Sequence, residues 1–471
     1  MAQRTVKAKE MVQDIRSHMG RAALMEKYHI SARELTLLLK KLVELGVLAQ
    51  AEAREIESQT GAATAHVFEC PECGTVANED LDECPNCGVM VAKIEAEVME
   101  EEQESPVGNL ADQPAGLKEK RLDVASERLS LPVLFRGDLE RSGFFRSKGV
   151  KSLTQLKWKF KTGGWVSCSP AIAFKLVYFG SWDGILYAVD VEAGQEKWRH
   201  QSEGPISCSP AIASGRVYFG TSDGQLRVLN AETGAPIWNF RSAGPLSSSP
   251  AITETMIYFG GSDANLYAVD IKSGSTKWKF KAGGLISSSP AMVSGLVCFG
   301  SYDGKVYALD SVSGQVRWTF KTAGPVSASP AIADGMVYFG SWDGTLYAVD
   351  AESGQERWSF KSGSKVMGCA AVGYGNVFFG NAAAKVYGVE TRTGQERWRS
   401  EVEGPISSSP ALTYSNLLYI GSADRYLHVL DLESGKERWK FKTEGAVNSS
   451  AVVHAEVVYF GSDDGNLYAL A

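Results

Sequence analysis

The stretch Ala348-Val349-Asp350-Ala351-Glu352-Ser353-Gly354-Gln355-Glu356-Arg357-Trp358 contains the pattern Ala-x-Asp-x-x-x-Gly-x-x-x-Trp, which recurs with small changes along the chain. A fixed period of this length indicates a repeat architecture. We expect the tryptophans to pack between neighbouring repeats, because indole offers a large, flat apolar surface. They are separated by six intervals of 40 residues and a last one of 41: Trp158, Trp198, Trp238, Trp278, Trp318, Trp358, Trp398 and Trp439.

Each repeat contains four short segments rich in β-branched and aromatic residues. In one repeat these segments are 326–332, 336–341, 345–350 and 355–361, separated by Ala-Asp-Gly, Trp-Asp-Gly and Glu-Ser-Gly turns. Short strands joined by such turns are typical of β-hairpins. Each repeat is therefore predicted to be a four-stranded antiparallel sheet, and a four-stranded repeat of this length is typical of a propeller blade.

The number of repeats distinguishes a closed ring from a linear solenoid. The last repeat lacks its fourth strand, but residues 155–161 have the missing pattern and precede the first repeat. Pairing these segments would cover an edge that is otherwise exposed. We therefore predict a C-terminal all-β propeller of eight blades over residues 151–471, closed by strand 155–161. The glycine that ends the second strand recurs eight times, at Gly180, Gly220, Gly260, Gly300, Gly340, Gly380, Gly421 and Gly461.

The recurring motif resembles the tryptophan-docking motif of PQQ-like (pyrroloquinoline-quinone type) repeat propellers, over residues 153–471. Similar eight-bladed rings occur in quinoprotein alcohol dehydrogenases and in the scaffold lipoprotein of the outer-membrane barrel-assembly machinery. The resemblance implies the fold, whereas one fold hosts many functions. The dehydrogenases carry long insertions and often a disulfide between adjacent cysteines. This chain has neither feature, so bound PQQ is not expected.

One face of the predicted ring carries both the Ser-x-Asp-Gly turns and the loops between blades. Trp165, Trp182, Tyr302 and Trp342 fall in these segments, at positions where the repeat does not require an aromatic residue. Exposed aromatic side chains dominate the energetics of interfaces, so these four predict a surface for a partner. The aspartates of the turns are expected to form tight hairpins and ion pairs with nearby loop lysines.

The sixth repeat departs from the others. It has Met367-Gly368-Cys369-Ala370 where most repeats have Ser-x-Ser-Pro, and 381–384 replaces Ser-x-Asp-Gly. A single ligand site on a pseudo-symmetric ring needs one repeat to differ, so Cys369 joins the candidate surface. The serines of the first strands are expected to fill the central channel. They have no apparent His and Asp partners, which argues against a hydrolase triad.

Two Cys-Pro-x-Cys-Gly knuckles contribute Cys70, Cys73, Cys84 and Cys87. Four thiolates from two turns supply a tetrahedral Zn²⁺ site. The spacing resembles a short zinc ribbon, predicted over residues 66–92, whereas rubredoxin-type iron sites use the same knuckles with a much longer spacer. Because sulfur fills all four positions, the site is expected to be structural.

Residues 1–60 have helical periodicity and are predicted to form a small α-helical module. The stretch 23–31 and the helix predicted after it resemble a helix-turn-helix. DNA binding through residues 1–92 is therefore one hypothesis, and protein docking or dimerisation is the other. Residues 93–150 include the acidic run 95–102 and are predicted to be a flexible linker, in which 131–145 is apolar enough to dock on the propeller.

The composition is that of a folded protein, with 44% hydrophobic and 22% charged residues and a formal charge of −7 over 471 residues. Residues 1–20 have no apolar core and no apolar run could span a bilayer, so a cytoplasmic location without membrane contact is expected. The favoured function is a non-enzymatic scaffold whose ring binds a protein partner or ligand. The alternatives are a transcription regulator with a sensing ring and a PQQ-dependent dehydrogenase. The oligomeric state stays open.

Overall fold

The structure is a computed structural model that describes residues 24, 67–69, 76–78, 134–145, 147–152 and 155–471. The chain divides into two units, Met1–Asp123 and Val124–Ala471. In the first unit, β1 (Val67–Glu69) and β2 (Val76–Asn78) form an antiparallel hairpin. The four predicted zinc ligands and nearly all of the helical module lie outside the described residues, so both stay predictions. None of the helices described is long and apolar enough to cross a membrane.

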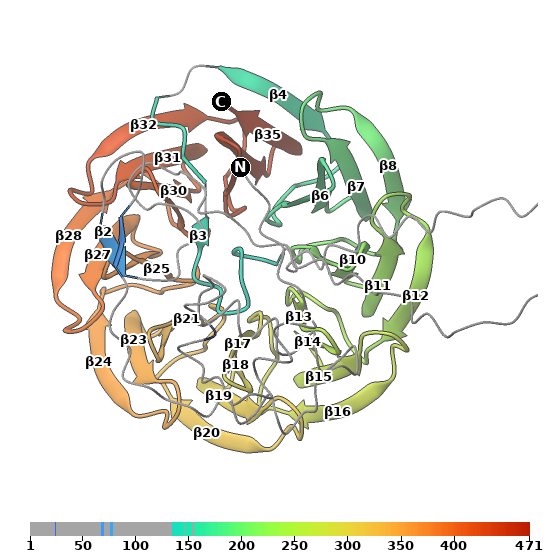
Figure 1. Ribbon diagram of the computed structural model, residues 1–471, viewed down its shortest axis with the longest axis horizontal. Helices are drawn as coiled ribbons and strands as arrows, with labels where there is room; N and C mark the ends of the chain where they lie inside the picture. Colours follow the sequence, from blue (N-terminus) through green and yellow to red (C-terminus); the bar gives the residue numbers. More distant parts are fainter. Residues whose placement is uncertain (1–23, 25–66, 70–75, 79–133, 146, 153–154) are drawn as a thin grey trace, which may run out of the picture. The chain divides into compact units, whose positions relative to one another are not determined.

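Eight sheets surround a common axis in the second unit, and we number them as blades 1 to 8 in chain order (Figure 1). Within each blade the strands run antiparallel from the axis to the rim. The inner strands are β5 (Ala171–Ala173), β9 (Ala211–Ala213), β13 (Ala251–Ile252), β17 (Ala291–Val293), β21 (Ala331–Ala333), β25 (Ala371–Gly373), β29 (Ala411–Thr413) and β33 (Val452–His454). The second strands are β6 (Leu176–Gly180), β10 (Arg216–Gly220), β14 (Met256–Gly260), β18 (Leu296–Ser301), β22 (Met336–Gly340), β26 (Asn376–Gly380), β30 (Leu417–Gly421) and β34 (Val457–Ser462).

The third and fourth strands complete each blade. The third strands are β7 (Ile185–Asp190), β11 (Gln225–Asn230), β15 (Asn265–Asp270), β19 (Lys305–Asp310), β23 (Thr345–Asp350), β27 (Lys385–Glu390), β31 (Tyr426–Asp431) and β35 (Asn466–Leu470). The outer strands are β8 (Glu196–Gln201), β12 (Pro236–Arg241), β16 (Thr276–Lys281), β20 (Val316–Lys321), β24 (Glu356–Lys361), β28 (Glu396–Glu401), β32 (Glu437–Lys442) and, in blade 8, β4 (Leu156–Lys161). The predicted eight-bladed propeller is therefore confirmed.

Blade 8 closes the ring as the sequence predicts. Its outer strand β4 pairs antiparallel with β35, with Lys161 opposite Asn466 and Leu156 opposite Leu470. The backbone groups of Gln155 and Ala471 exchange two further hydrogen bonds, at 3.0 and 3.1 Å. Strands from the two ends of the repeat region thus share one sheet, which leaves no open edge at the closure.

A second closure runs around the axis, just before the inner strands. In each blade one backbone N–H donates to the side chain at the same position of the next blade, and the Ser450 N–H completes the circle on Ser169 Oγ at 3.2 Å. Residues 326–330 were predicted as part of a strand, but they form the connection that carries Ser329 into this circle. They do not join the sheet because Pro330 has no N–H and the Ser329 N–H donates to the next blade. The eight positions are Ser169, Ser209, Ser249, Ser289, Ser329, Cys369, Ser409 and Ser450.

The repeated tryptophans join neighbouring blades, which confirms their predicted role. The Trp318 indole N–H donates to the Ala351 carbonyl of the next blade at 2.9 Å. Gly354 lies against the same ring with a φ of +70°, and a Cβ there would be 2.6 Å from Cδ2. The motif glycine therefore permits both the turn and the close approach of the backbone to the indole. Equivalent bonds join Trp158 to Val191, Trp198 to Ala231, Trp278 to Ser311, Trp358 to Thr391 and Trp398 to Leu432.

The segment 134–145 is bound to the inner strands. Its strand β3 (Phe144–Phe145) pairs in parallel with β29. Carbonyl groups of the segment accept hydrogen bonds from the Met292, Ile332, Val372 and Leu412 N–H groups, one in each of blades 4 to 7, at 2.8 to 2.9 Å. This confirms that the apolar stretch docks on the propeller. It also corrects the predicted linker 93–150, whose last part belongs to the ring because it supplies acceptors to four blades.

Candidate functional site

The turns between second and third strands and the loops between blades share one face of the ring, which we call the turn face. Successive strands alternate in direction, so these connections fall on the same side. Backbone bonds link them directly, since the Trp182 and Trp342 N–H groups donate to the carbonyls of Trp165 and Pro325, both at 2.9 Å. The turns that carry the motif glycines lie on the opposite face.

Trp165 and Trp182 form an exposed aromatic pair on blade 1. Their side chains are 52% and 46% exposed, and the ring centroids are 5.1 Å apart. The Trp182 indole N–H donates to Ser167 Oγ at 2.8 Å, which fixes the orientation of the ring. The pair is therefore preorganised, and it presents apolar surface that the described part of the chain leaves uncovered.

Tyr302 and Trp342 form a second pair between blades 4 and 5, and both side chains are half-buried. Their ring centroids are 5.4 Å apart, and the Trp342 indole N–H donates to Ser327 Oγ at 2.8 Å. Lys365 Nζ lies 4.5 Å from the centre of the Trp342 ring, in cation–π geometry. Blades 1 and 5 lie across the ring from each other (Figure 1). The four predicted aromatics thus share a face but form two separate pairs, because their repeats are half a ring apart.

The aspartates of the turns hold the turns and their neighbouring loops. Asp303 accepts bonds from the Lys305 and Gly283 N–H groups at 3.0 and 2.9 Å, and from the Tyr307 hydroxyl at 2.5 Å. Burial, and then the bond to Asp303, raise the pKa of Tyr307 to about 12. The prediction that these aspartates form ion pairs with loop lysines is wrong for blade 3. There Lys281 Nζ donates to the backbone carbonyl of Asp263 and not to its carboxylate. These carboxylates are fully engaged by the fold.

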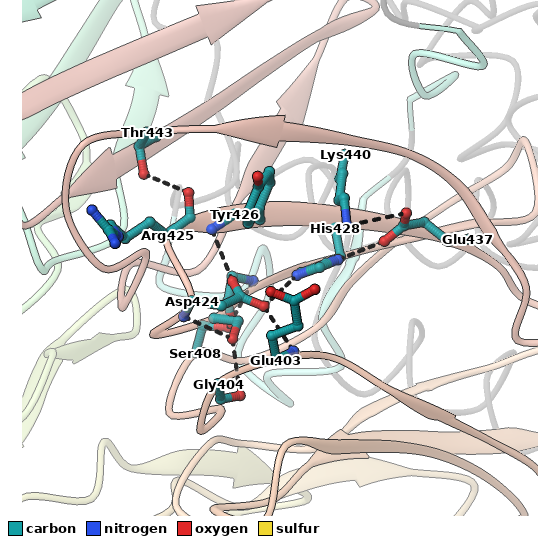
Figure 2. Close-up of polar contacts among 12 residues, drawn as sticks. Glu403, Gly404, Ser408, Asp424, Arg425, Tyr426, His428, Glu437, Lys440 and Thr443 are labelled. Carbon is teal, nitrogen blue, oxygen red and sulfur yellow. Dashed lines mark hydrogen bonds and ion pairs between the residues drawn. The ribbon is translucent and has the colours of Figure 1, made fainter.

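Blade 7 has a histidine where most blades have this tyrosine. Figure 2 shows His428 between two carboxylates, with Nε2 2.9 Å from Asp424 Oδ2 and Nδ1 2.7 Å from Glu437 Oε2. The imidazole is buried, and Lys440 Nζ lies 4.8 Å from the centre of the adjacent Tyr426 ring. Both ring nitrogens are engaged, so neither is free to act on a substrate. The cluster joins the turn, β31 and β32.

Cys369 is not part of an exposed surface. It is buried in the circle around the axis, where Sγ accepts the Ser329 N–H at 3.3 Å and its own N–H donates to Ser409 Oγ at 3.0 Å. In the same blade the Asn381 amide oxygen accepts N–H groups of the turn at 3.0 and 3.1 Å, replacing the missing aspartate. The prediction of Cys369 as a surface residue is therefore wrong, because its thiol substitutes for a serine of the circle.

Two arginines of the docked segment occupy the axis. Arg136 donates to the Ala370 and Pro410 carbonyls at 2.6 and 3.3 Å, and Arg141 donates to the Pro290 carbonyl at 2.6 Å. Both are buried, and burial lowers the pKa of Arg141 to about 10. In the part of the chain that the structure describes, no three His, Cys, Asp or Glu side chains are grouped to hold a metal.

A family model described as outer membrane protein assembly factor BamB matches residues 182–310 and 282–470, which is more than half of the chain. The chain belongs to the BamB family. Its matched residues begin within blade 1 and end in β35, so the match covers most of the ring. None of the curated proteins matches the chain.

This BamB-family ring is similar to several solved structures. BamB from Moraxella catarrhalis is 21% identical with a TM-score of 0.60, over 68% of this chain and 99% of that one. The computationally designed protein Ika8 is 19% identical with a TM-score of 0.62, over 67% and 99%. Quinohemoprotein alcohol dehydrogenase from Comamonas testosteroni is 14% identical with a TM-score of 0.63, over 74% and 81%. At these identities the likeness shows the fold alone.

Two features of this BamB-family ring were not found by sequence reasoning. The first is the pair Arg136 and Arg141 at the axis, because an apolar segment in which two arginines are balanced by Asp138 and Glu140 gave little indication of it. The second is His428, which has a visible sequence signal, because most of the aligned repeats have tyrosine at that position.

Proposed function

We propose that this BamB-family chain is a non-enzymatic scaffold whose ring binds a protein partner on the turn face. The observation that carries the proposal is the pair of exposed, oriented indoles, Trp165 and Trp182, opposite the second pair, Tyr302 and Trp342. Burying one large apolar side chain contributes about 1.5–3 kcal/mol. Two such pairs therefore give a partner two anchor points on one face.

The chemistry of the ring supports a binding role over catalysis. Asp303 and its counterparts are occupied by turn N–H groups and tyrosine hydroxyls, and His428 is held at both nitrogens. The axis is occupied by arginine side chains of the chain itself. The family description, an outer-membrane protein assembly factor, also names a role that depends on contacts with other proteins.

The proposal also includes the cellular location of the protein and a role for residues 1–92. A cytoplasmic location agrees with four free, buried cysteines in the ring, although the family description names an outer-membrane factor. Fractionation of cells tests it. Zinc binding by the cysteine quartet is proposed on spacing alone, and DNA binding by residues 1–92 has no support from the comparisons.

Photo-crosslinking tests the partner surface. A benzophenone amino acid is placed at Trp182, at Trp342 or at Val312, which is 85% exposed on the opposite face. Positions 182 and 342 are expected to give adducts with the same partner, whereas position 312 is expected to give none. Adducts from position 312 alone, or none from the turn face, would show that the ring binds elsewhere.

A further inference from the structure

Lysines without an ion pair to any described residue are concentrated in one sector of the turn face, over blades 4 to 6, on the side of Tyr302 and Trp342. In the sector over blades 2, 7 and 8, exposed or half-exposed carboxylates accompany the cations Arg241, Arg425, Lys442 and Lys161. The lysines are Lys305, Lys321, Lys361 and Lys365. The carboxylates are Glu203, Glu403, Glu444 and Asp463.

One pair of lysines is arranged against the preference of the sheet. Lys305 and Lys321 are directly opposite each other in the β19–β20 pairing. Like charges at such positions are destabilising. In six of the other blades at least one of the two residues at this position is neutral, so no like charges face each other. In blade 6 the two residues are the oppositely charged Lys385 and Glu401, which form an ion pair. Blade 4 therefore accepts an electrostatic cost that the fold itself does not require.

The carboxylates closest to these lysines do not neutralise them. Asp343 accepts the Thr345 and Ala323 N–H groups at 2.9 and 3.1 Å and the Tyr347 hydroxyl at 3.0 Å, and Asp303 is engaged in the same way. None of the four lysines forms an ion pair with any residue that the structure describes. Their charge is available to an anionic group from outside.

The aromatic pair supplies an apolar anchor inside this charged sector. Tyr302 meets the edge of Trp342, whose ring lies 4.5 Å from Lys365 Nζ. Leu285, whose carbonyl accepts the Tyr302 N–H, is half-buried beside them. An apolar centre with cations around it matches a segment that carries one apolar side chain between carboxylates.

We propose that the Lys–aromatic patch, defined as Lys305, Lys321, Lys361, Lys365, Tyr302 and Trp342, binds an acidic segment of a protein partner. Its carboxylates contact the lysines, and an apolar side chain packs on Tyr302 and Trp342. The inference rests on the proposed function, since it assigns a chemistry to one half of the proposed partner surface.

The structure favours a peptide over a single-stranded nucleic acid at this patch. Bases bind by stacking on open aromatic faces along a continuous cationic groove. Here the rings of Tyr302 and Trp342 are inclined at 65° to each other, so they do not form parallel platforms for successive bases. A short acidic segment meets the lysines alone.

Fluorescence anisotropy tests the inference with the full chain. The probe is a short labelled peptide of Glu and Asp with one central leucine, and an oligothymidine of similar length is the comparison. The double variant Lys321→Glu/Lys361→Glu is compared with Arg241→Glu, the exposed cation at the same register in blade 2. Circular dichroism checks that both variants keep the fold.

The peptide is expected to bind more weakly as salt rises, and the double variant to lose about tenfold in affinity, while Arg241→Glu stays within about twofold. Trp342→Ala is expected to weaken binding as well. Absent peptide binding, equal losses in both charge variants, or tighter binding of the oligothymidine would overturn the inference. If adducts at position 182 persist in that case, the proposed function stands and only the acidic chemistry fails.

Discussion

The indole N–H of Trp439 in blade 7 donates to the Val150 carbonyl at 3.0 Å, and the Tyr419 hydroxyl donates to the same oxygen at 3.3 Å. In six other blades the acceptor follows the third strand of the next blade, as Val191 does for Trp158 at 3.1 Å. Val150 therefore supplies the carbonyl acceptor for the blade 7 tryptophan, which the turn after the third strand of the next blade supplies elsewhere. The segment before the first repeat is part of the ring at its rim as well as at its axis.

Loss of an axis arginine is expected to destabilise the ring. Arg141→Met should lower the free energy of unfolding by about 3 kcal/mol, because it leaves the buried Pro290 and Ser249 carbonyls without their donors. Urea unfolding measures the change. Arg317→Met is the control, since it removes only an exposed ion pair with Asp310 and should cost under about 1 kcal/mol. Equal losses would contradict a bonding role for Arg141.

Two glycines separate the cost of backbone strain from the cost of crowding. Gly314 and Gly335 have φ of +70° and +72°, but a Cβ at Gly314 would be 2.6 Å from Trp278 Cδ2, whereas nothing lies within 4 Å at Gly335. Gly335→Ala should therefore cost about 1 kcal/mol and Gly314→Ala about 3 kcal/mol. Thermal and urea unfolding compare them. Similar costs would show that the indole moves away freely.

Blade 2 contains a mismatch that a substitution should relieve. Arg216 donates to the Ile271 carbonyl at 3.3 Å, and the buried Trp238 indole N–H has no hydrogen-bond partner among the residues that the structure describes. Other blades have Leu176, Met256 or Met336 at the arginine position. Arg216→Met frees the carbonyl and should raise the free energy of unfolding by about 1 kcal/mol. A loss of stability in urea would count against this account.

Acid should weaken the turns of the opposite face. Hydrogen bonds from the Ser313 N–H and then from Arg317 lower the pKa of Asp310. A lowered folded-state pKa gives stability that is present above the unfolded value of about 4 and is lost as pH falls through the folded value. The urea midpoint of the native chain should therefore exceed that of Asp310→Asn at neutral pH and approach it in acid. Asn230 already holds the equivalent turn in blade 2, so the variant keeps the geometry. A difference that does not change with pH would refute this linkage.

The cysteine quartet predicts about one Zn²⁺ per chain. Metal analysis of purified protein measures it, and Cys70→Ser with Cys84→Ser should remove the metal. Cys168→Ser, in the ring, should retain it, because that thiol is buried at the Gly180 backbone. Iron instead of zinc, or metal retained by the double variant, would contradict the zinc ribbon.

Short-range pattern was sufficient to predict the blades, their number and the closing strand. The motif Ala-x-Asp-x-x-x-Gly-x-x-x-Trp specifies a third strand, a turn and a fourth strand within one repeat, and its recurrence places each Trp against the next blade. The aromatic residues of the candidate surface were also predictable, because turn positions such as 182 and 342 do not need indoles. Each of these inferences depends on residues near one another in the chain or on strict repetition.

Only the tertiary structure decided what happens where distant blades meet. The roles of Arg136 and Arg141 depend on the carbonyls of Ala370 and Pro290, to which they donate hydrogen bonds. Cys369 is a member of the axis circle because Ser329 and Ser409 flank it in space. The concentration of unpaired lysines over blades 4 to 6 likewise arises from the order of blades around the axis. Such features are long-range juxtapositions, so no single repeat encodes them.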